Sequence, residues 1–179
     1  RDRRYKGNQA HAEYLEQMAG KFFDLLQKYH GLGERERLLL RLAAILHDCG
    51  KFISMSAPGE CAYQIIMSTE ILGISHMERE MVACIVRYNT MELPNFSEFD
   101  GKLGNDKYLI VMKLAAILRV CNALDRSHRQ KFADMKLTIK DSNIVITTAY
   151  PDNITLEKKT LKDKQDFFEE VYGLGFEIK

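Results

Sequence analysis

The pattern of apolar and polar residues changes its period about two-thirds of the way along the chain. Up to about residue 125, apolar residues recur every three or four positions, which is the spacing of one face of an α-helix. Beyond that point apolar residues alternate with polar ones, as they do along half-buried β-strands. The sequence therefore predicts a mainly α fold with a small C-terminal α+β appendage, divided into a helical domain over 1–133 and a subdomain over 134–179.

The helical part is predicted to contain five helices, over about 8–30, 35–48, 60–72, from residue 75, and over about 107–125. The second is apolar nearly all round, which is typical of a helix at the centre of a bundle. The fourth opens with Ser75-His76-Met77-Glu78, in which Ser and Glu have the spacing of a capping box. Residues 89–106 contain Pro94 and two glycines and predict a long loop.

The appendage is predicted to begin with a β-hairpin. Apolar residues alternate at 137–139 and 144–148, on either side of a polar Asp-Ser-Asn turn. A further strand is expected at 154–156, a helix over about 159–172, and a final strand at 176–178. This helix is expected to end at Gly173, because glycine commonly follows the last residue of a helix.

Composition narrows the class of protein. The chain has 179 residues, of which 46% are hydrophobic and 28% charged, as in a globular rather than a disordered protein. A net charge of +1 gives no general attraction for polyanions, so any polyanion site must be a local patch. No apolar run is long enough for a membrane span, and the charged opening residues do not resemble a secretory segment. Four cysteines without C-x-x-C spacing indicate reduced thiols in a cytoplasmic protein, and the absence of an initial Met indicates a piece of a longer one.

The strongest chemical feature is His47-Asp48, an imidazole and a carboxylate side by side at the end of the most apolar helix. His11 lies on the apolar stripe of the first helix, and Asp125 ends another core helix. Because imidazole and carboxylate are ligands for divalent cations, these four side chains would hold one Mn²⁺, Mg²⁺ or Fe²⁺ and leave positions for water and phosphate. The alternative is structural: buried histidines are often hydrogen-bonded core residues, and Arg126 is available to neutralise Asp125.

The order H…HD…D is similar to that of the HD superfamily of metal-dependent phosphohydrolases. Longer segments resemble the C-terminal HD domain of the exopolyphosphatase/guanosine pentaphosphate phosphatase family, namely AILHDCGKFIS at 44–54, VRY at 86–88, LRVCNALDRSH at 118–128 and FFE at 167–169. The resemblance covers nearly the whole chain. It implies a parent enzyme whose N-terminal actin-like domain hydrolyses inorganic polyphosphate or guanosine pentaphosphate. The HD domain would extend the substrate channel and support a homodimer.

The sequence departs from that family where a second metal would be bound. The family has a His-rich H-H-K-H-S segment where this chain has APGECA at 57–62, and Asn89 replaces the His of its Arg-Tyr-His. These changes predict one metal rather than two, and a domain that does not hydrolyse phosphoanhydrides by itself. Two alternatives stay open: a self-standing mononuclear HD phosphohydrolase acting on nucleotides, and a purely structural dimerisation module.

Four cationic side chains are predicted to contact the phosphates of the substrate: Lys51, Arg87, Arg119 and Arg126. If the last core helix continues far enough, Arg119, Asn122, Arg126 and Arg129 share one face and form a row suited to a phosphate chain. The alternatives are a solvated face, or arginines paired with Asp125 and Asp134. The basic residues within 1–6 are interpreted as a solvated linker, and neither nucleic acid nor a membrane is expected as a partner.

Overall fold

The computed structural model describes residues 2–51, 53–99 and 103–179, with side chains from residue 9 onward. A mainly helical fold with a small C-terminal sheet is confirmed. The elements are α1 (Asp2–Leu25), α2 (Gln27–His30), α3 (Glu34–Leu46), α4 (Pro58–Ser68), α5 (His76–Thr90), α6 (Asn105–Leu124), β1 (Lys136–Lys140), β2 (Asn143–Thr147), α7 (Thr155–Tyr172) and β3 (Gly175–Ile178).

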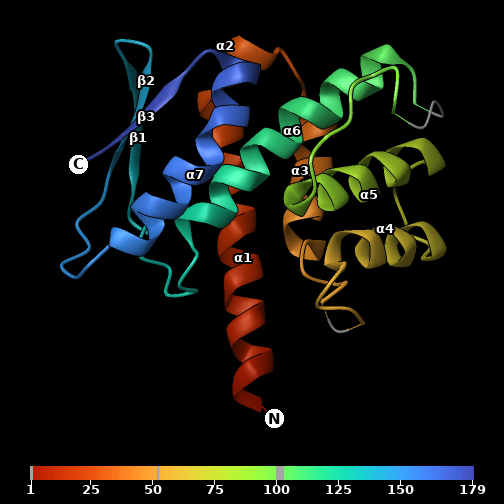
Figure 1. The fold of residues 1–179 in the computed structure, drawn as a ribbon, viewed down its shortest axis with the longest axis horizontal. Coiled ribbons are helices and arrows are strands. Elements are labelled where there is room, and N and C mark those ends of the chain that lie inside the picture. Colours follow the sequence, from red (N-terminus) through yellow and green to blue (C-terminus); the bar gives the residue numbers. More distant parts are fainter. Residues whose placement is uncertain (1, 52, 100–102) are drawn as a thin grey trace.

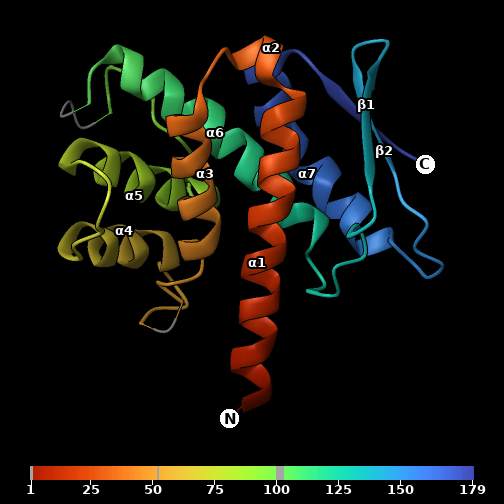
Figure 2. The same ribbon diagram turned by 180° about the vertical axis from the view of Figure 1, so that it is seen from behind.

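The central helices α1, α3 and α6 separate two peripheral groups of elements. Helices α4 and α5 lie on one side, whereas α7 and the sheet lie on the other (Figure 1). Seen from behind, α1 and α3 run side by side (Figure 2). One apolar core extends from Leu40 of α3 through Leu118 of α6 to Phe168 of α7, all of which are buried. None of the helices in the described part of the chain combines the length and apolar character needed to cross a membrane.

Two local predictions are confirmed in detail. The Ser75 hydroxyl accepts a hydrogen bond from the backbone N–H of Glu78, and the Glu78 carboxylate accepts one from the backbone N–H of Ser75, so the capping box is present. The predicted hairpin pairs β1 with β2 antiparallel, with Leu137 opposite Ile146. Strand β3 then joins β2 in parallel, so the hairpin becomes a three-stranded sheet.

Two element predictions are wrong. The first helix begins at Asp2 rather than near residue 8, and a break after Leu25 separates it from the short α2. The strand predicted at 154–156 is instead the start of α7. The side chain of Asn153 accepts a hydrogen bond from the backbone N–H of Thr155, which favours the first turn of a helix over a short strand.

The turn after α3 is pressed against the start of α4. A Cβ atom at position 50 would lie 2.0 Å from the backbone oxygen of Pro58 and 2.6 Å from the backbone nitrogen of Ala62, so only glycine fits there. This close approach fixes the turn that carries Asp48.

We expect Gly50→Ala to lower the free energy of unfolding by about 1–3 kcal/mol, because overpacking forces the backbone of the turn and of α4 apart. Chemical denaturation measures the change. The control is Gly20→Ala, where the added Cβ meets only the movable guanidinium of Arg37. Equal stability of the two variants would show that the turn can relax at no cost.

Candidate metal centre

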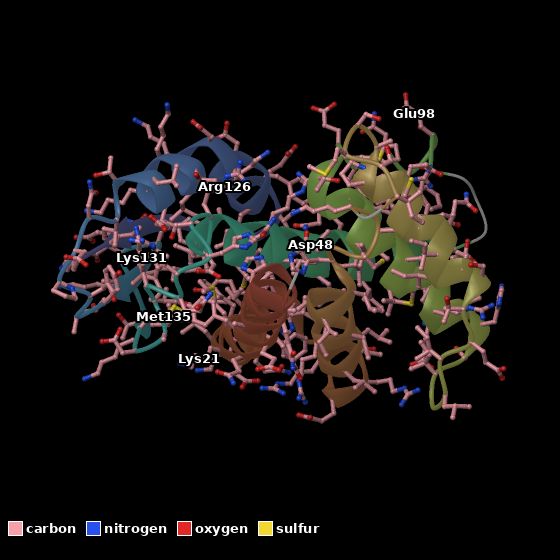
Figure 3. The ribbon with its side chains drawn as sticks, turned by 90° about the horizontal axis from the view of Figure 1, so that it is seen from below. Lys21, Asp48, Glu98, Arg126, Lys131 and Met135 are labelled. Atoms are coloured by element: carbon pink, nitrogen blue, oxygen red, sulfur yellow. The ribbon has the colours of Figure 1, made fainter. Side chains whose placement is uncertain are left out.

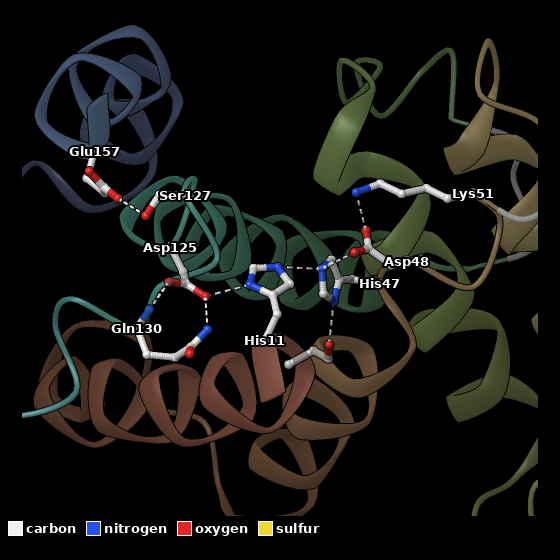
Figure 4. Close-up of polar contacts among 9 residues, drawn as sticks. His11, His47, Asp48, Lys51, Asp125, Ser127, Gln130 and Glu157 are labelled. Atoms are coloured by element: carbon white, nitrogen blue, oxygen red, sulfur yellow. Dashed lines mark hydrogen bonds and ion pairs between the residues drawn. The ribbon is translucent and has the colours of Figure 1, made fainter. Parts of the chain in front are cut away.

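Three helices bring the predicted ligands to one place. His11 comes from α1, His47 is the C-terminal capping residue that follows α3, and Asp125 is the C-terminal capping residue that follows α6. His11 and Asp125 are fully buried, and His47 is nearly so. Asp48 follows in the turn after α3, so the four side chains meet where these helices are in contact (Figure 4).

Each of the two imidazoles is held through its Nδ1 atom. His47 Nδ1 lies 2.6 Å from the backbone oxygen of Ala44, which can only accept, so this nitrogen carries the proton. His11 Nδ1 lies 2.6 Å from Asp125 Oδ2, where it likewise donates to a carboxylate. In their neutral forms both rings therefore present an unprotonated Nε2 atom.

Those two Nε2 atoms face each other. The distance between His11 Nε2 and His47 Nε2 is 3.1 Å, and His47 Nε2 lies 3.2 Å from Asp48 Oδ2. Three lone pairs converge on one point, which is repulsive unless a proton or a cation lies between them. Ligands at about 2.1 Å from one ion and at right angles to each other would be separated by about 3.0 Å, so the observed spacing fits a divalent metal.

The convergent group comprises His11, His47 and Asp48, whose ligand atoms all lie within 4.8 Å of one another. Asp125 lies outside this group, on the far side of the His11 ring (Figure 4). Its carboxylate also accepts hydrogen bonds from the backbone and side-chain nitrogens of Gln130, at 2.8 and 3.2 Å. In this geometry Asp125 orients His11 and fixes its tautomer, which is a role that carboxylates often have beside a metal-binding histidine.

Asp48 is the part of the centre nearest to solvent, with 18% of its side chain exposed. Partial burial by itself raises the pKa of its carboxyl. The contact with His47 at 3.2 Å and the ammonium of Lys51 at 2.7 Å outweigh burial and hold the pKa well below its usual value. Asp48 is therefore ionised and available as a ligand across the whole neutral range.

One further ring, which the residue pattern did not predict, contacts this centre. His128 stacks on His11 with ring centroids 3.7 Å apart and an angle of 7° between the planes. Burial, and after it the neighbouring His11, lower the pKa of His128, so this ring is neutral at neutral pH. The Ser127-His128 pair belongs to a segment that carried the family resemblance. Nothing in its spacing indicates a stacking contact with a residue on the first helix.

The chain matches a family model described as Ppx/GppA phosphatase, domain III, over residues 2–166. It belongs to this family. A search of curated proteins found no match. A family described as a third domain implies a multidomain parent protein.

The helix in this Ppx/GppA domain does not continue far enough for Arg119, Asn122, Arg126 and Arg129 to share one face. Helix α6 ends at Leu124 and the chain then turns, so the predicted shared face of Arg119 and Arg126 does not exist. Arg119 donates to the backbone oxygens of Tyr88 and Met91 and covers the ring of Phe167. These contacts brace the end of α5 against α6 and α7, which is a structural use of an arginine.

The other three cations differ in their surroundings. Arg87 is paired with Glu60 of α4 and lies over the Tyr63 ring. Lys51 is exposed beside Asp48. Arg126 is also exposed and has no ion pair among the described residues, so it does not neutralise the buried Asp125. Figure 3 labels both Arg126 and Asp48 in a view of the molecule from below.

Proposed function

We propose that this Ppx/GppA domain III is a metal-carrying, polyanion-binding module of an exopolyphosphatase-like phosphohydrolase, acting on inorganic polyphosphate or guanosine pentaphosphate. The observation that carries the proposal is the convergence of three ligand atoms, His11 Nε2, His47 Nε2 and Asp48 Oδ2, each within 3.2 Å of another. Apolar residues would fill a core that only packs helices at lower cost, which favours a ligand-binding role for these buried polar groups.

His11, His47 and Asp48 would hold one Mn²⁺, Mg²⁺ or Fe²⁺, and Asp125 would keep the His11 imidazole in place. A divalent ion there would supply charge neutralisation for phosphate oxygens and would lower the pKa of bound water. Three protein ligands leave coordination positions open for such oxygens. The ion supports binding; hydrolysis belongs to the actin-like domain of the parent chain, and a homodimer would extend the polyanion path.

The test is a titration of the chelator-treated protein with Mn²⁺, followed by a phosphate-release assay on polyphosphate. We expect one equivalent of metal, because Asn89 and the segment at 57–62 offer no further histidine. We also expect no significant release of phosphate. Two equivalents would contradict the mononuclear centre. Metal-dependent turnover that is lost in Asp48→Ala would favour the self-standing HD phosphohydrolase instead.

Polyphosphate binding should depend steeply on salt. Each cation that meets a phosphate releases bound counterions, by analogy with nucleic acids, so affinity should fall between low and physiological ionic strength. We expect Arg126→Ala to weaken binding and to reduce the slope of this dependence by about one ion, while the melting temperature stays unchanged because Arg126 is exposed.

The measurement is fluorescence anisotropy of a labelled polyphosphate at several salt concentrations. Lys21→Ala is the matched control, since Lys21 is an exposed cation on α1 that is seen apart from Arg126 and Asp48 in Figure 3. Affinity that does not change with salt would rule out a polyanion-binding role for this domain.

A further inference from the structure

His128 stacks on the His11 ring from a turn with an unusual backbone conformation. Its backbone φ angle is 57°, in the left-handed region, and Gln130 has a φ of 52° in the same turn. Its backbone N–H donates to the backbone oxygen of Asp125 at 2.9 Å. Two hydrogen bonds anchor the turn. Before His128, the Ser127 hydroxyl donates to the buried Glu157 carboxylate, and after it, the Gln130 backbone N–H donates to the Asp125 carboxylate. Positive φ angles are uncommon outside glycine, and two of them in one short turn give the chain a tight local path that fixes the position of His128.

The parallel stacking sets what the His128 nitrogens can reach. The lone pair of His11 Nε2 lies in the plane of its ring, so a metal bound there lies close to that plane. The ring plane of His128 is nearly parallel, with its centroid 3.7 Å from that of His11. A ring displaced in this way does not direct its own lone pairs at the same ion, and His128 is outside the convergent group. It can instead meet a molecule bound to the metal above the plane of His11.

The surroundings of His128 suit a phosphate oxygen or a water at that position. The ring is partly exposed, in contrast to the fully buried His11 beneath it. Two other groups of the centre also reach solvent, because 18% of the Asp48 side chain is exposed and Lys51 is exposed beside it. A ring N–H there offers a donor of fixed direction, and Lys51 offers a mobile cation beside it.

We propose that His128 is a positioning residue, which donates a hydrogen bond to a phosphate oxygen or water that occupies an open coordination position next to His11. This role rests on the proposed metal centre. It gives the phosphate oxygen or water on the metal a hydrogen-bond partner, His128, which is not among the four residues of the H…HD…D order. Stacking on His11 and the anchored turn hold the donor in place before the anion arrives, so binding costs little side-chain conformational entropy.

The experiment uses Mn²⁺ and inorganic phosphate as probes. Water-proton relaxation of the Mn²⁺-loaded protein reports exchangeable water on the ion, and added phosphate should lower it by displacing that water. His128→Phe keeps a flat ring for the stack but has no nitrogen. His128→Asn gives up the stack but suits the left-handed backbone, and its amide is too short to reach. His76→Phe, at an exposed histidine of α5 that lies outside the convergent group, is the matched control.

We expect both His128 variants to bind Mn²⁺ within about twofold of the wild type and phosphate about tenfold more weakly, the loss typical of one hydrogen bond to a charged group. If His128→Phe does not fold, His128→Asn alone gives the comparison.

Unchanged phosphate affinity in a folded variant would overturn the role of His128. A large loss of Mn²⁺ affinity would do so as well, because it would make His128 a ligand. If the wild-type protein binds Mn²⁺ but phosphate does not displace water, the role is also wrong. A wild-type protein that binds no Mn²⁺ at all would overturn the metal centre itself, and the first titration distinguishes that case.

Discussion

His47→Ala should lower the affinity for Mn²⁺ by more than about a hundredfold, whereas Asp125→Asn should lower it by only about tenfold. The reason is their different positions: His47 Nε2 is directed at the convergence point, whereas Asp125 contacts the opposite side of His11. Removing the partner of a ligand typically costs about 10–100-fold, and an asparagine oxygen still accepts the hydrogen bond from His11 Nδ1.

Isothermal titration of the three proteins with Mn²⁺ measures these differences. A second readout is the melting temperature, because saturating metal at about a hundred times its dissociation constant stabilises the folded state by about 2.7 kcal/mol. That rise should vanish in His47→Ala. Asp134→Asn serves as the control, since Asp134 is an exposed carboxylate that accepts hydrogen bonds from the Thr148 hydroxyl and the Ala149 backbone N–H. An equally severe loss in Asp125→Asn would make Asp125 a ligand, as the H…HD…D order predicts.

Glu157→Ala should be among the most destabilising single changes in this chain, at about 3–5 kcal/mol. Glu157 is fully buried at the start of α7, where it accepts hydrogen bonds from Ser127 and from the ammonium of Lys131 at 3.3 Å. Only 10% of the Lys131 side chain is exposed, so loss of the carboxylate leaves a buried cation with the backbone oxygen of Asn153 as its hydrogen-bond acceptor. Such a loss corresponds to a fall in melting temperature on the order of 10 °C.

Thermal and denaturant unfolding measure the effect, with Glu170→Ala, an exposed carboxylate on the same helix, as the control. A double variant, Glu157→Leu with Lys131→Met, should recover much of the lost stability because neither charge then remains buried. It would still weaken the anchor of Ser127 and with it the placement of His128. A Glu157→Ala protein as stable as the control would show that water reaches Lys131 in the folded state.

The sequence by itself determined the local elements of this protein. Helical spacing, the Ser75–Glu78 capping box and the alternation around 141–143 are properties of neighbouring residues, so they could be predicted before any tertiary contact was known. The convergence of His11, His47 and Asp48 was also predictable, because each lies on or just after the apolar face of a core helix and the helices must bury those faces together.

Only the tertiary structure decided what each polar group in the centre faces. The position of Asp125 behind His11, the stack of His128 and the burial of Glu157 depend on side chains that are far apart in the sequence. Such contacts follow from the packing angles of helices and from the turn at which α6 ends, and no periodicity encodes them. Because α6 ends at this turn, Arg119 lies on the helix and Arg126 lies beyond it. A helix ends where tertiary contacts stabilise another backbone conformation more than further helical hydrogen bonds would.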